Sequence, residues 1–224
     1  MAAPEAPAGR VARSLTAFLA KSTGQVITLF ARLITALRPV WQGSEPLPRQ
    51  RVYFANHTSN GDFVVLWTAL PPFLRANTRP VAAAEYWLTS RLRAFVGRNV
   101  FNAVLIDRRP EMRAENPVDQ MVAALDQGFS LILFPEGKRN TTSDLVLPFK
   151  TGLYHVAKAR PNVDLVPVWI ANLSRIMPKG EIVPLPLLCT VTFGAAMHLD
   201  SDEPKERFLE RAAEALRALA PKVE

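Results

Sequence analysis

The sequence predicts a single α/β domain, in which helices cover a mainly parallel central sheet, preceded by an amphipathic helix. Short apolar runs alternate along most of the chain with stretches of helical periodicity, and this alternation is typical of α/β domains. Hydrophobic residues make up 49% and charged residues 21% of the 224 residues, which excludes a wholly disordered chain. A chain of this length buries a sizeable core without disulfides or structural metal, and it has a single cysteine, Cys189.

The N-terminal part of the chain predicts a long amphipathic helix over roughly residues 12–38. Winding the chain at about 100° per residue places large apolar side chains on one half of the helix and cations on the other. The apolar half carries Leu15, Phe18, Leu19, Val26, Leu29, Phe30, Leu33, Ile34 and Leu37. The other half carries Arg13, Lys21, Arg32 and Arg38. Because Pro39 ends the pattern, we divide the chain into a flexible start (1–9), this helix (10–40) and one main domain (41–224).

The positions of the cations in this helix indicate how the helix could contact a membrane. Lys21 and Arg32 interrupt the apolar runs, so we expect neither a spanning helix nor a cleavable signal peptide. An apolar face backed by cations is typical of a helix that lies in a membrane interface, where Lys and Arg meet anionic headgroups. The alternative is a helix packed on the domain with solvated charges. We expect a helix that lies in the membrane interface, and therefore a membrane-associated protein, peripheral or monotopic, on the cytoplasmic face.

The rest of the chain predicts strands and helices in alternation after a proline-containing linker, 41–49. Strands are expected at residues 51–56, 80–84, 100–106, 130–134, 165–171 and 187–193, where short apolar runs occur. Helices are expected at residues 63–70, 86–96, 117–127, 151–159 and 202–219. Residues 135–149 and 172–186 are rich in proline and polar residues and are expected to be long loops.

Capping and stop signals support several of these boundaries. Pro71-Pro72 stops the helix at 63–70. Asn116-Pro117 opens the next well-marked helix, and Gly128 follows its end. For the last helix, Asp200 or Ser201 is the expected cap.

A histidine and an aspartate follow the first domain strand, in the segment NHTSNGD. Ligands in such α/β domains bind at strand ends. Across the turn that contains Gly61, His57 and Asp62 can fold back onto each other. Asp62 would then accept a hydrogen bond from one imidazole nitrogen and leave the other nitrogen free as a base. The alternative, for this spacing alone, is a purely structural His–Asp pair.

A second candidate site follows the buried strand 130–134, which runs into the turn Pro135-Glu-Gly-Lys-Arg139. Gly137 lets the backbone approach a ligand, and the cations of Lys138 and Arg139 can meet phosphate. The alternative is an ordinary Pro-Gly turn with solvated charges.

A third candidate is Arg108, in the segment Leu105-Ile-Asp-Arg-Arg109 at the end of another apolar run. Its guanidinium can bind phosphate through two parallel hydrogen bonds, which suits Arg better than Lys. The alternative is a surface arginine pair bonded to Asp107 and Glu111.

Taken in order, these motifs and the V-P-V segment around Pro167 resemble the four-block pattern of the glycerolipid acyltransferases. The chain is similar to the lysophospholipid (1-acylglycerol-3-phosphate) acyltransferase family over about residues 50–170. The resemblance implies His57 as general base, Asp62 as its orienting partner and Arg108 as a phosphate ligand. It further implies substrate binding by Phe134, Pro135, Glu136, Gly137, Arg139 and Pro167, with Lys150 as a lesser candidate. Lys138 and Asn140 depart from the common F-P-E-G-T-R-S, which leaves the exact acceptor open.

The chemistry implied by the resemblance is direct acyl transfer. His57 would deprotonate the free hydroxyl of a lysophospholipid, which attacks an acyl thioester, and coenzyme A or acyl carrier protein would leave as a thiol. We do not expect a covalent acyl-enzyme, because no G-x-S-x-G elbow is present and Cys189 falls on a predicted strand. We expect no cofactor and no metal, and a backbone N–H near Gly137 as the oxyanion donor.

The net charge of +7 suits nucleic acid, an anionic membrane or a phosphorylated substrate. No nucleic-acid recognition motif accompanies it, so nucleic acid is not an expected partner. The expected partners are a lysophospholipid acceptor, an acyl-CoA or acyl carrier protein donor, and an anionic membrane surface. Two alternatives stay open: an acyltransferase for another lysolipid, such as a lyso-aminolipid, and a non-catalytic lipid-binding relative.

Overall fold

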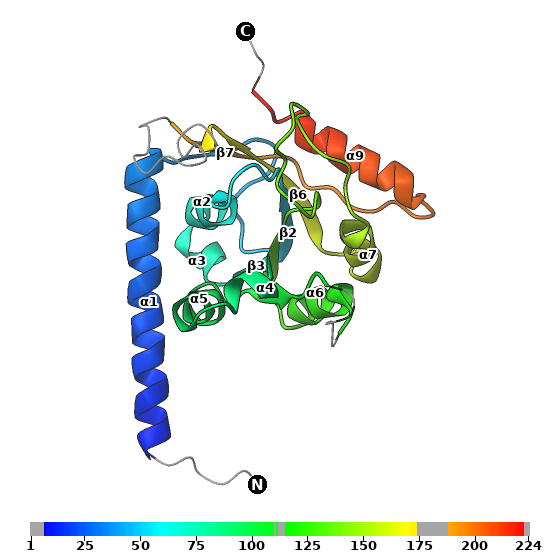
Figure 1. Ribbon diagram of the computed structural model, residues 1–224. Helices are drawn as coiled ribbons and strands as arrows, with labels where there is room; N and C mark the ends of the chain where they lie inside the picture. The colour runs from blue at the N-terminus through cyan, green and yellow to red at the C-terminus, as the bar shows by residue number, and fades with distance from the viewer. Residues whose placement is uncertain (1–6, 110, 112–114, 174–187, 222–224) are drawn as a thin grey trace.

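A seven-stranded sheet with helices on both faces forms the centre of the protein, and a long helix runs along one side (Figure 1). The structure, a computed structural model, describes residues 7–109, 111, 115–173 and 188–221. The strands are β1 (Arg38–Trp41), β2 (Arg51–Ala55), β3 (Thr78–Ala83), β4 (Val104–Ile106), β5 (Ser130–Leu133), β6 (Asp164–Ala171) and β7 (Thr190–Phe193). Their order is β1-β7-β6-β2-β5-β3-β4, and all neighbouring pairs are parallel except β6 and β7. The predicted α/β fold class is confirmed.

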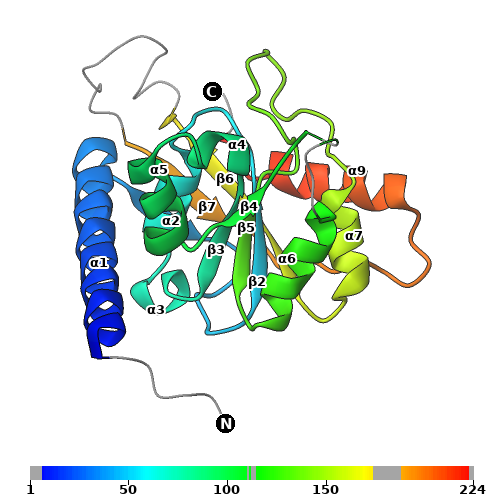
Figure 2. The ribbon, with the colours of Figure 1, turned by 60° about the horizontal axis from the view of Figure 1, so that its bottom comes forward.

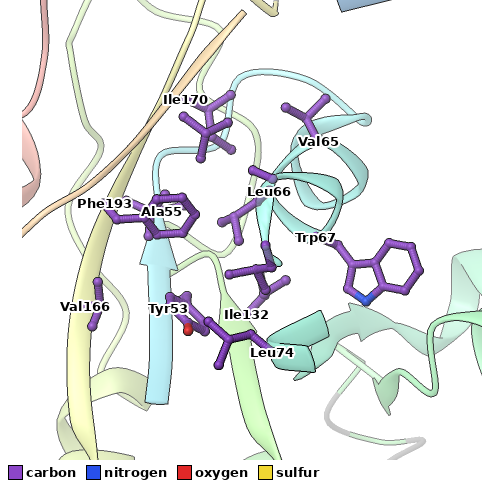
Figure 3. Packing of buried hydrophobic residues seen from close by; sticks show 14 of the residues in the cluster. Tyr53, Ala55, Val65, Leu66, Trp67, Leu74, Ile132, Val166, Ile170 and Phe193 are labelled. Atoms are coloured by element: carbon purple, nitrogen blue, oxygen red, sulfur yellow. The ribbon is translucent and has the colours of Figure 1, made fainter. Parts of the chain in front are cut away.

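The helices form two layers around the sheet (Figures 1 and 2). One face carries α2 (Asp62–Ala69), α3 (Pro72–Arg75), α4 (Ala84–Trp87), α5 (Arg91–Phe95) and a π-helical turn, η1 (Val96–Val100). The other carries α6 (Pro117–Asp126), α7 (Gly152–Ala159) and α9 (Lys205–Arg217). Each layer has its own hydrophobic cluster against the sheet. Figure 3 shows part of the first cluster, in which Leu66 of α2 points toward Ile132 and Phe193 of the sheet and Trp67 lies farther out.

The long helix α1 (Pro7–Thr35) packs on the domain through small residues together with Ile27 and Ile34, while most of its large apolar side chains lie outside. Ala20, Gly24 and Ala31 are buried, and a side chain at Gly24 would contact Val100 and Trp67. The large apolar residues face away from the domain and are about half to three-quarters exposed. These are Leu15 (57%), Phe18 (66%), Leu19 (48%), Val26 (66%), Leu29 (60%), Phe30 (65%) and Leu33 (73%). Only Ile34 and Leu37 of the predicted apolar half pack against the core cluster.

A spanning helix was not expected from the sequence. Within the described ranges, none of the helices combines the length and the apolar character needed to cross a bilayer.

The structure divides or shortens three of the predicted elements. The predicted helix 86–96 is divided into α4 and α5, because the side chain of Ser90 accepts a hydrogen bond from the backbone of Arg93 and starts a new helix. The predicted strand 100–106 begins only at Val104, since η1 continues to Val100 with Gly97 packed against Trp87. The last helix begins at Lys205 after Pro204, so neither predicted cap is the N-cap.

The strand β1 was not predicted, and it takes residues 38–41 into the sheet across the expected boundary at residue 40. β1 pairs only with β7, and an edge strand tolerates Pro39 because one row of its backbone groups needs no partner. The predicted loop 172–186 and the start of the predicted strand 187–193 lie mostly outside the described residues, as does most of the predicted flexible start 1–9.

Candidate active site

His57 stands two residues beyond the carboxyl end of β2, which lies between β6 and β5 in the sheet. Its backbone is held on both sides by the loop after β5. The N–H of His57 donates to Glu136 Oε1 (2.7 Å), and its carbonyl accepts from the N–H of Asn140 (2.6 Å). The loop that carries the second motif therefore fixes the position of the first.

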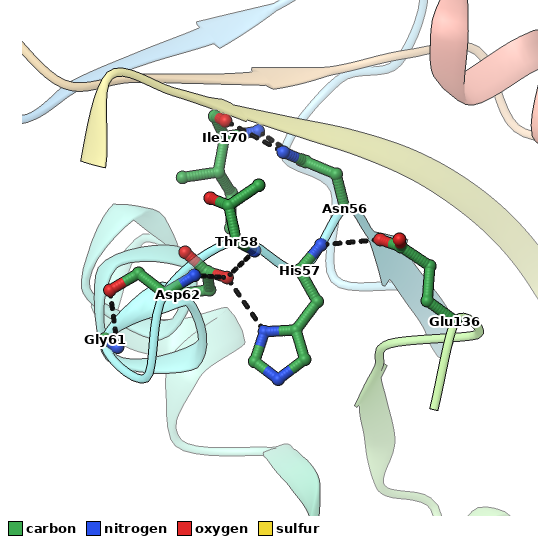
Figure 4. A network of polar contacts seen from close by, with 8 residues as sticks. Asn56, His57, Thr58, Gly61, Asp62, Glu136 and Ile170 are labelled. Atoms are coloured by element: carbon green, nitrogen blue, oxygen red, sulfur yellow. Dashed lines mark hydrogen bonds and ion pairs between the residues drawn. The ribbon is translucent and has the colours of Figure 1, made fainter. Parts of the chain in front are cut away.

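Asp62 is the first residue of α2, is fully buried and lies directly beside the His57 ring (Figure 4). Its Oδ2 lies 2.8 Å from His57 Nδ1 and also accepts from the N–H groups of Thr58 (2.7 Å) and Ser59 (2.8 Å). Three hydrogen bonds thus hold one carboxylate oxygen in place. Because an ionised carboxylate can only accept, Nδ1 of the neutral ring carries the hydrogen and Nε2 presents a lone pair.

The ring of His57 is positioned but remains accessible. It stacks on Phe134 with ring centroids 4.5 Å apart, and its side chain is 22% exposed. Figure 4 shows Nε2 on the side of the ring away from Asp62. Among the described residues no hydrogen bond engages Nε2. The pair can therefore act as an oriented base of the kind that removes a proton from a hydroxyl.

Glu136 lies behind His57 rather than on the surface. Its side chain is 1% exposed, and its second oxygen accepts from the N–H of Leu147 (2.9 Å). Burial raises the pKa of this carboxyl, and the backbone bonds from Leu147 and His57 oppose that shift. With each oxygen bound to a backbone N–H, the carboxylate ties the loop after β5 to the histidine.

Asn56 is a buried residue whose role the sequence did not indicate. Its side-chain amide donates to the carbonyl of Ile170 (3.0 Å) and accepts from the N–H of Ile170 (2.8 Å), which joins the end of β2 to β6 (Figure 4). A polar residue directly after the run Val52–Ala55 was the available signal.

The turn of the second motif brings three cations to one exposed region. Gly137 has φ +70°, and a Cβ there would stand 3.0 Å from Lys150 Cγ, so the Lys150 side chain lies across the glycine. The N–H of Lys150 donates to the carbonyl of Pro135 (2.7 Å). Lys138 and Arg139 are exposed beside them. The N–H of Gly137 itself donates to Phe134, so it is not the free oxyanion donor that we expected near this position.

Arg108 is not beside the histidine. It follows β4, which is three strand positions from β2, or about 14 Å at the usual strand spacing. Its guanidinium forms an ion pair with Glu85 at the start of α4, a partner that the sequence did not suggest, while Arg109 pairs with Asp107. Burial raises the pKa of Glu85, but the hydrogen bond and the charge of Arg108 bring it below its usual range.

Pro167 lies in the sheet, buried in β6 opposite Phe54. Its carbonyl accepts from the N–H of Gly194 (2.9 Å). It therefore shapes the sheet below the histidine and does not join the polar residues at the strand ends.

Two pockets occur elsewhere in the described parts of the chain, one between β4 and α6 and one beneath α1, and His57 lines neither. No three His, Cys, Asp or Glu side chains of the described residues lie close enough together to hold a metal ion. Cys189 is fully buried, and burial together with the charge of Asp62 raises its pKa to about 12.

Comparisons with known proteins bear on the chemistry of this arrangement. A family model described as Acyltransferase matches residues 38–171. The 1-acyl-sn-glycerol-3-phosphate acyltransferases of Salmonella typhimurium and Escherichia coli are each 32% identical over 130 residues, which cover 55% of this chain and 47% of theirs. The enzyme of that name from Limnanthes douglasii is 29% identical over 161 residues, which cover 71% of this chain and 54% of the relative. The chain thus spans about half the length of these curated relatives.

A solved structure supports the fold. The crystal structure of the 1-acyl-sn-glycerophosphate (LPA) acyltransferase PlsC from Thermotoga maritima superimposes with a TM-score of 0.64 at 21% identity. The match covers 89% of this chain and 79% of that one. The fold of most of this chain is therefore shared with another protein.

Proposed function

The chain belongs to the acyltransferase family, and from that membership we propose that it transfers a fatty acyl group from acyl-CoA or acyl carrier protein to the free hydroxyl of a lysophospholipid. The first-choice acceptor is 1-acylglycerol-3-phosphate, which gives phosphatidic acid, because the relatives described above carry that substrate in their names. The observation that carries the proposal is the 2.8 Å contact between His57 Nδ1 and buried Asp62, with Nε2 directed away from it.

In the proposed reaction, one base takes the proton of the acceptor hydroxyl and later gives it to the leaving thiolate. His57 Nε2 takes the proton of the acceptor hydroxyl as the hydroxyl oxygen attacks the thioester carbonyl carbon, and Asp62 stabilises the imidazolium that forms. The tetrahedral intermediate collapses as the carbon–sulfur bond breaks. The imidazolium then protonates the departing thiolate, so that an ester and a free thiol leave a neutral His57.

The other motif residues divide into two roles in this proposal. Glu136 and Asn140 bind the backbone of His57 and hold it in position. Lys138, Arg139 and Lys150 supply exposed positive charge near the histidine for the acceptor phosphate. Arg108 would contribute by exchanging its contact with Glu85 for a phosphate that extends toward β4.

Membrane association follows in this proposal from the orientation of α1. Seven large apolar side chains of α1 face away from the domain, an exposed stripe of the kind that marks a lipid or protein contact. Lipid is the proposed contact because cations flank the stripe and the acceptor itself resides in a bilayer. The packed-helix alternative would require these residues to face the core.

Two alternatives concern the acceptor and the chemistry. Lys138 replaces a neutral residue of the family pattern, which favours testing other anionic lysolipids and lyso-aminolipids beside lysophosphatidic acid. A non-catalytic lipid-binding relative would have no use for an oriented imidazole with a free Nε2.

Mass spectrometry of the products from a panel of lysolipids and acyl donors tests the proposal. We expect a diacyl product from lysophosphatidic acid together with release of free thiol. If only another lysolipid is acylated, the assignment of lysophosphatidic acid as the acceptor is wrong. If no diacyl product forms from any lysolipid, the proposed function is refuted. The result also separates acyl-CoA from acyl carrier protein as donor.

A further inference from the structure

A groove of about 410 Å³ lies beneath α1, at the opposite end of α2 from the candidate active site. Its lining includes the apolar residues Trp67, Pro72 and Val100 and the cations Lys21 and Arg75. Trp67 lies in the last turn of α2, whereas Asp62 begins that helix about 7.5 Å away along its axis, and His57 does not line the groove. The groove is therefore separate from the site around His57.

The charged groups at this groove are all cations. Lys21 and Arg75 line it, and Arg32 lies near enough that its charge, after burial, lowers the pKa of Arg75. In the part of the chain that the structure describes, none of the three forms an ion pair with an acid. Their mutual repulsion and their desolvation leave a site that favours an anion.

Arg75 is held firmly, but only by neutral groups. It donates to Thr28 Oγ1 (3.0 Å) and to the carbonyls of Leu70 (2.9 Å) and Thr68 (3.3 Å) at the end of α2, and it lies over the ring of Trp67. Its buried Nε makes no hydrogen bond to any described residue. These contacts orient the guanidinium and leave its full charge uncompensated.

The two cations of α1, Lys21 and Arg32, lie between the buried edge of the helix and its exposed apolar stripe. Lys21 and Arg32 are eleven residues apart, which is about three turns, so they share one flank of the helix. That flank separates the buried edge at Ala20 and Ala31 from the exposed apolar stripe. If the stripe enters the acyl region of a bilayer, the flank and the groove below it face the headgroups.

We propose that this groove binds the phosphate headgroup of an anionic phospholipid, with its glycerol backbone and upper acyl carbons against Trp67, Pro72 and Val100. The lipid is a structural partner that seats α1 on the bilayer, distinct from the acceptor that His57 deprotonates. This inference rests on the proposed membrane contact of α1 and does not depend on acyl transfer.

Binding of a soluble lipid to the full chain tests the proposal. We expect calorimetric titration with monomeric dihexanoyl-phosphatidylglycerol to give one saturable site, with dihexanoylphosphatidylcholine and inorganic phosphate each at least about tenfold weaker. Equal affinity for phosphatidylcholine would refute the role of the cations. Equal affinity for inorganic phosphate would show an anion site without lipid selectivity and would also overturn the proposal.

Variants locate the site. The double variant Lys21→Gln/Arg32→Gln should weaken phosphatidylglycerol binding about tenfold or more, which corresponds to about 1.4 kcal/mol. Ala76→Phe, which fills the groove from its exposed rim, should weaken binding without any change of charge. Lys158→Gln is the control, because it removes one exposed cation from α7 on the other side of the sheet. Unchanged affinity in both groove variants would refute the site.

Two further variants test whether the phosphatidylglycerol binds at the acceptor site instead of the groove. His57→Ala and Arg108→Ala should bind phosphatidylglycerol as the wild type does, and loss of binding in either would place the lipid in the acceptor site and overturn the proposal. Acyl transfer is measured on the same samples. A protein that binds the lipid but transfers no acyl group would refute the proposed function alone.

Discussion

Asp62 Oδ2 accepts three hydrogen bonds, from the His57 ring and from the backbone of Thr58 and Ser59, so the orientation of the imidazole is built into one short turn. Glu136 adds a second support from the loop after β5, through one bond to His57 and one to Leu147. At the scale of single residues, the site is a histidine whose ring and backbone are both fixed and whose Nε2 is left available.

Glu136→Gln separates a positioning role from acceptor binding. An amide nitrogen in place of one carboxylate oxygen would face a backbone N–H, and leaving such a buried group unpaired costs about 1–3 kcal/mol. We expect kcat to fall roughly tenfold or more while the KM for the acceptor changes less than about twofold. Steady-state kinetics with varied acceptor measures both.

The control for that variant is Glu210→Gln, which changes an exposed carboxylate on α9. It should leave both constants unchanged. A higher acceptor KM with unchanged kcat in Glu136→Gln would instead show that Glu136 binds the acceptor directly.

Cys189 should be nearly inert in the folded protein. Its pKa is raised to about 12 and its side chain is buried, so at pH 8 the thiolate fraction is roughly 10³-fold below that of an ordinary cysteine. Alkylation by iodoacetamide, followed by mass spectrometry, should be slower by at least that factor in buffer than in guanidinium chloride. Comparable rates in the two solutions would contradict the described environment of the thiol.

At the scale of elements, α1 shows what periodicity can and cannot predict. The spacing of Leu15, Phe18 and Leu29 predicts an amphipathic helix, and that helix is present. It does not say which face meets the domain, because that depends on how closely the helix approaches. Gly24 permits a close approach to Val100 and Trp67, so small residues carry much of the packing and most of the large ones stay outside.

Polar substitutions on the outer face of α1 should weaken membrane binding without loss of fold. Each large apolar side chain contributes about 1.5–3 kcal/mol when it is fully transferred from water. The triple variant Phe18→Ser/Leu29→Ser/Phe30→Ser should therefore bind anionic vesicles at least about 100-fold more weakly in a sedimentation assay. Its melting temperature should match that of the wild type, and Leu47→Ser is a control on an exposed residue away from α1. Unchanged vesicle binding would show that this face does not enter the bilayer.

Gly194 tests the packing between the end of β7 and the C-terminal part of the chain. A Cβ at Gly194 would stand 2.9 Å from Pro167 Cγ, which is closer than real Cβ atoms come, and 3.0 Å from Leu219 Cδ1, which is tighter than most real contacts. We expect Gly194→Ala to lower the free energy of unfolding by about 1–3 kcal/mol in urea denaturation. In Gly152→Ala the new Cβ meets Met121 at an ordinary 3.8 Å, so that control should be neutral or stabilising. Equal stability of the two variants would contradict the close packing.

Elements held by local signals were predictable, and elements that depend on distant partners were not. Asn116 and Pro117 mark the start of α6 in the sequence, and the helix begins there. β1 has no local signal, since it is a strand only because β7 pairs with it. The π turn at η1 brings Gly97 against Trp87, a contact that helical periodicity does not encode. The division between α4 and α5 did have a local signal, the Ser90 cap, and helical periodicity over residues 86–96 concealed it.

At the scale of the whole molecule, parallel strands explain how motifs far apart in sequence meet. β2 and β5 are neighbours and parallel, so their carboxyl ends bring His57 and Glu136 to one edge of the sheet. The order of the motifs in the sequence identified this pair of loops. It could not show that Glu136 turns inward to the backbone, or that Arg108 stands at the far strand β4 beside Glu85, because both depend on the path of loops and on the strand order.

The proposed function depends on the His57–Asp62 pair as the base of an acyl transfer to a lysophospholipid. The most direct measurement is thioester-dependent acylation of lysophosphatidic acid, followed by thiol release and product mass, in the wild type and in His57→Ala. We predict that kcat falls about 10²- to 10⁴-fold in the variant while its circular dichroism spectrum is retained. Equal turnover by the wild type and His57→Ala would contradict the account.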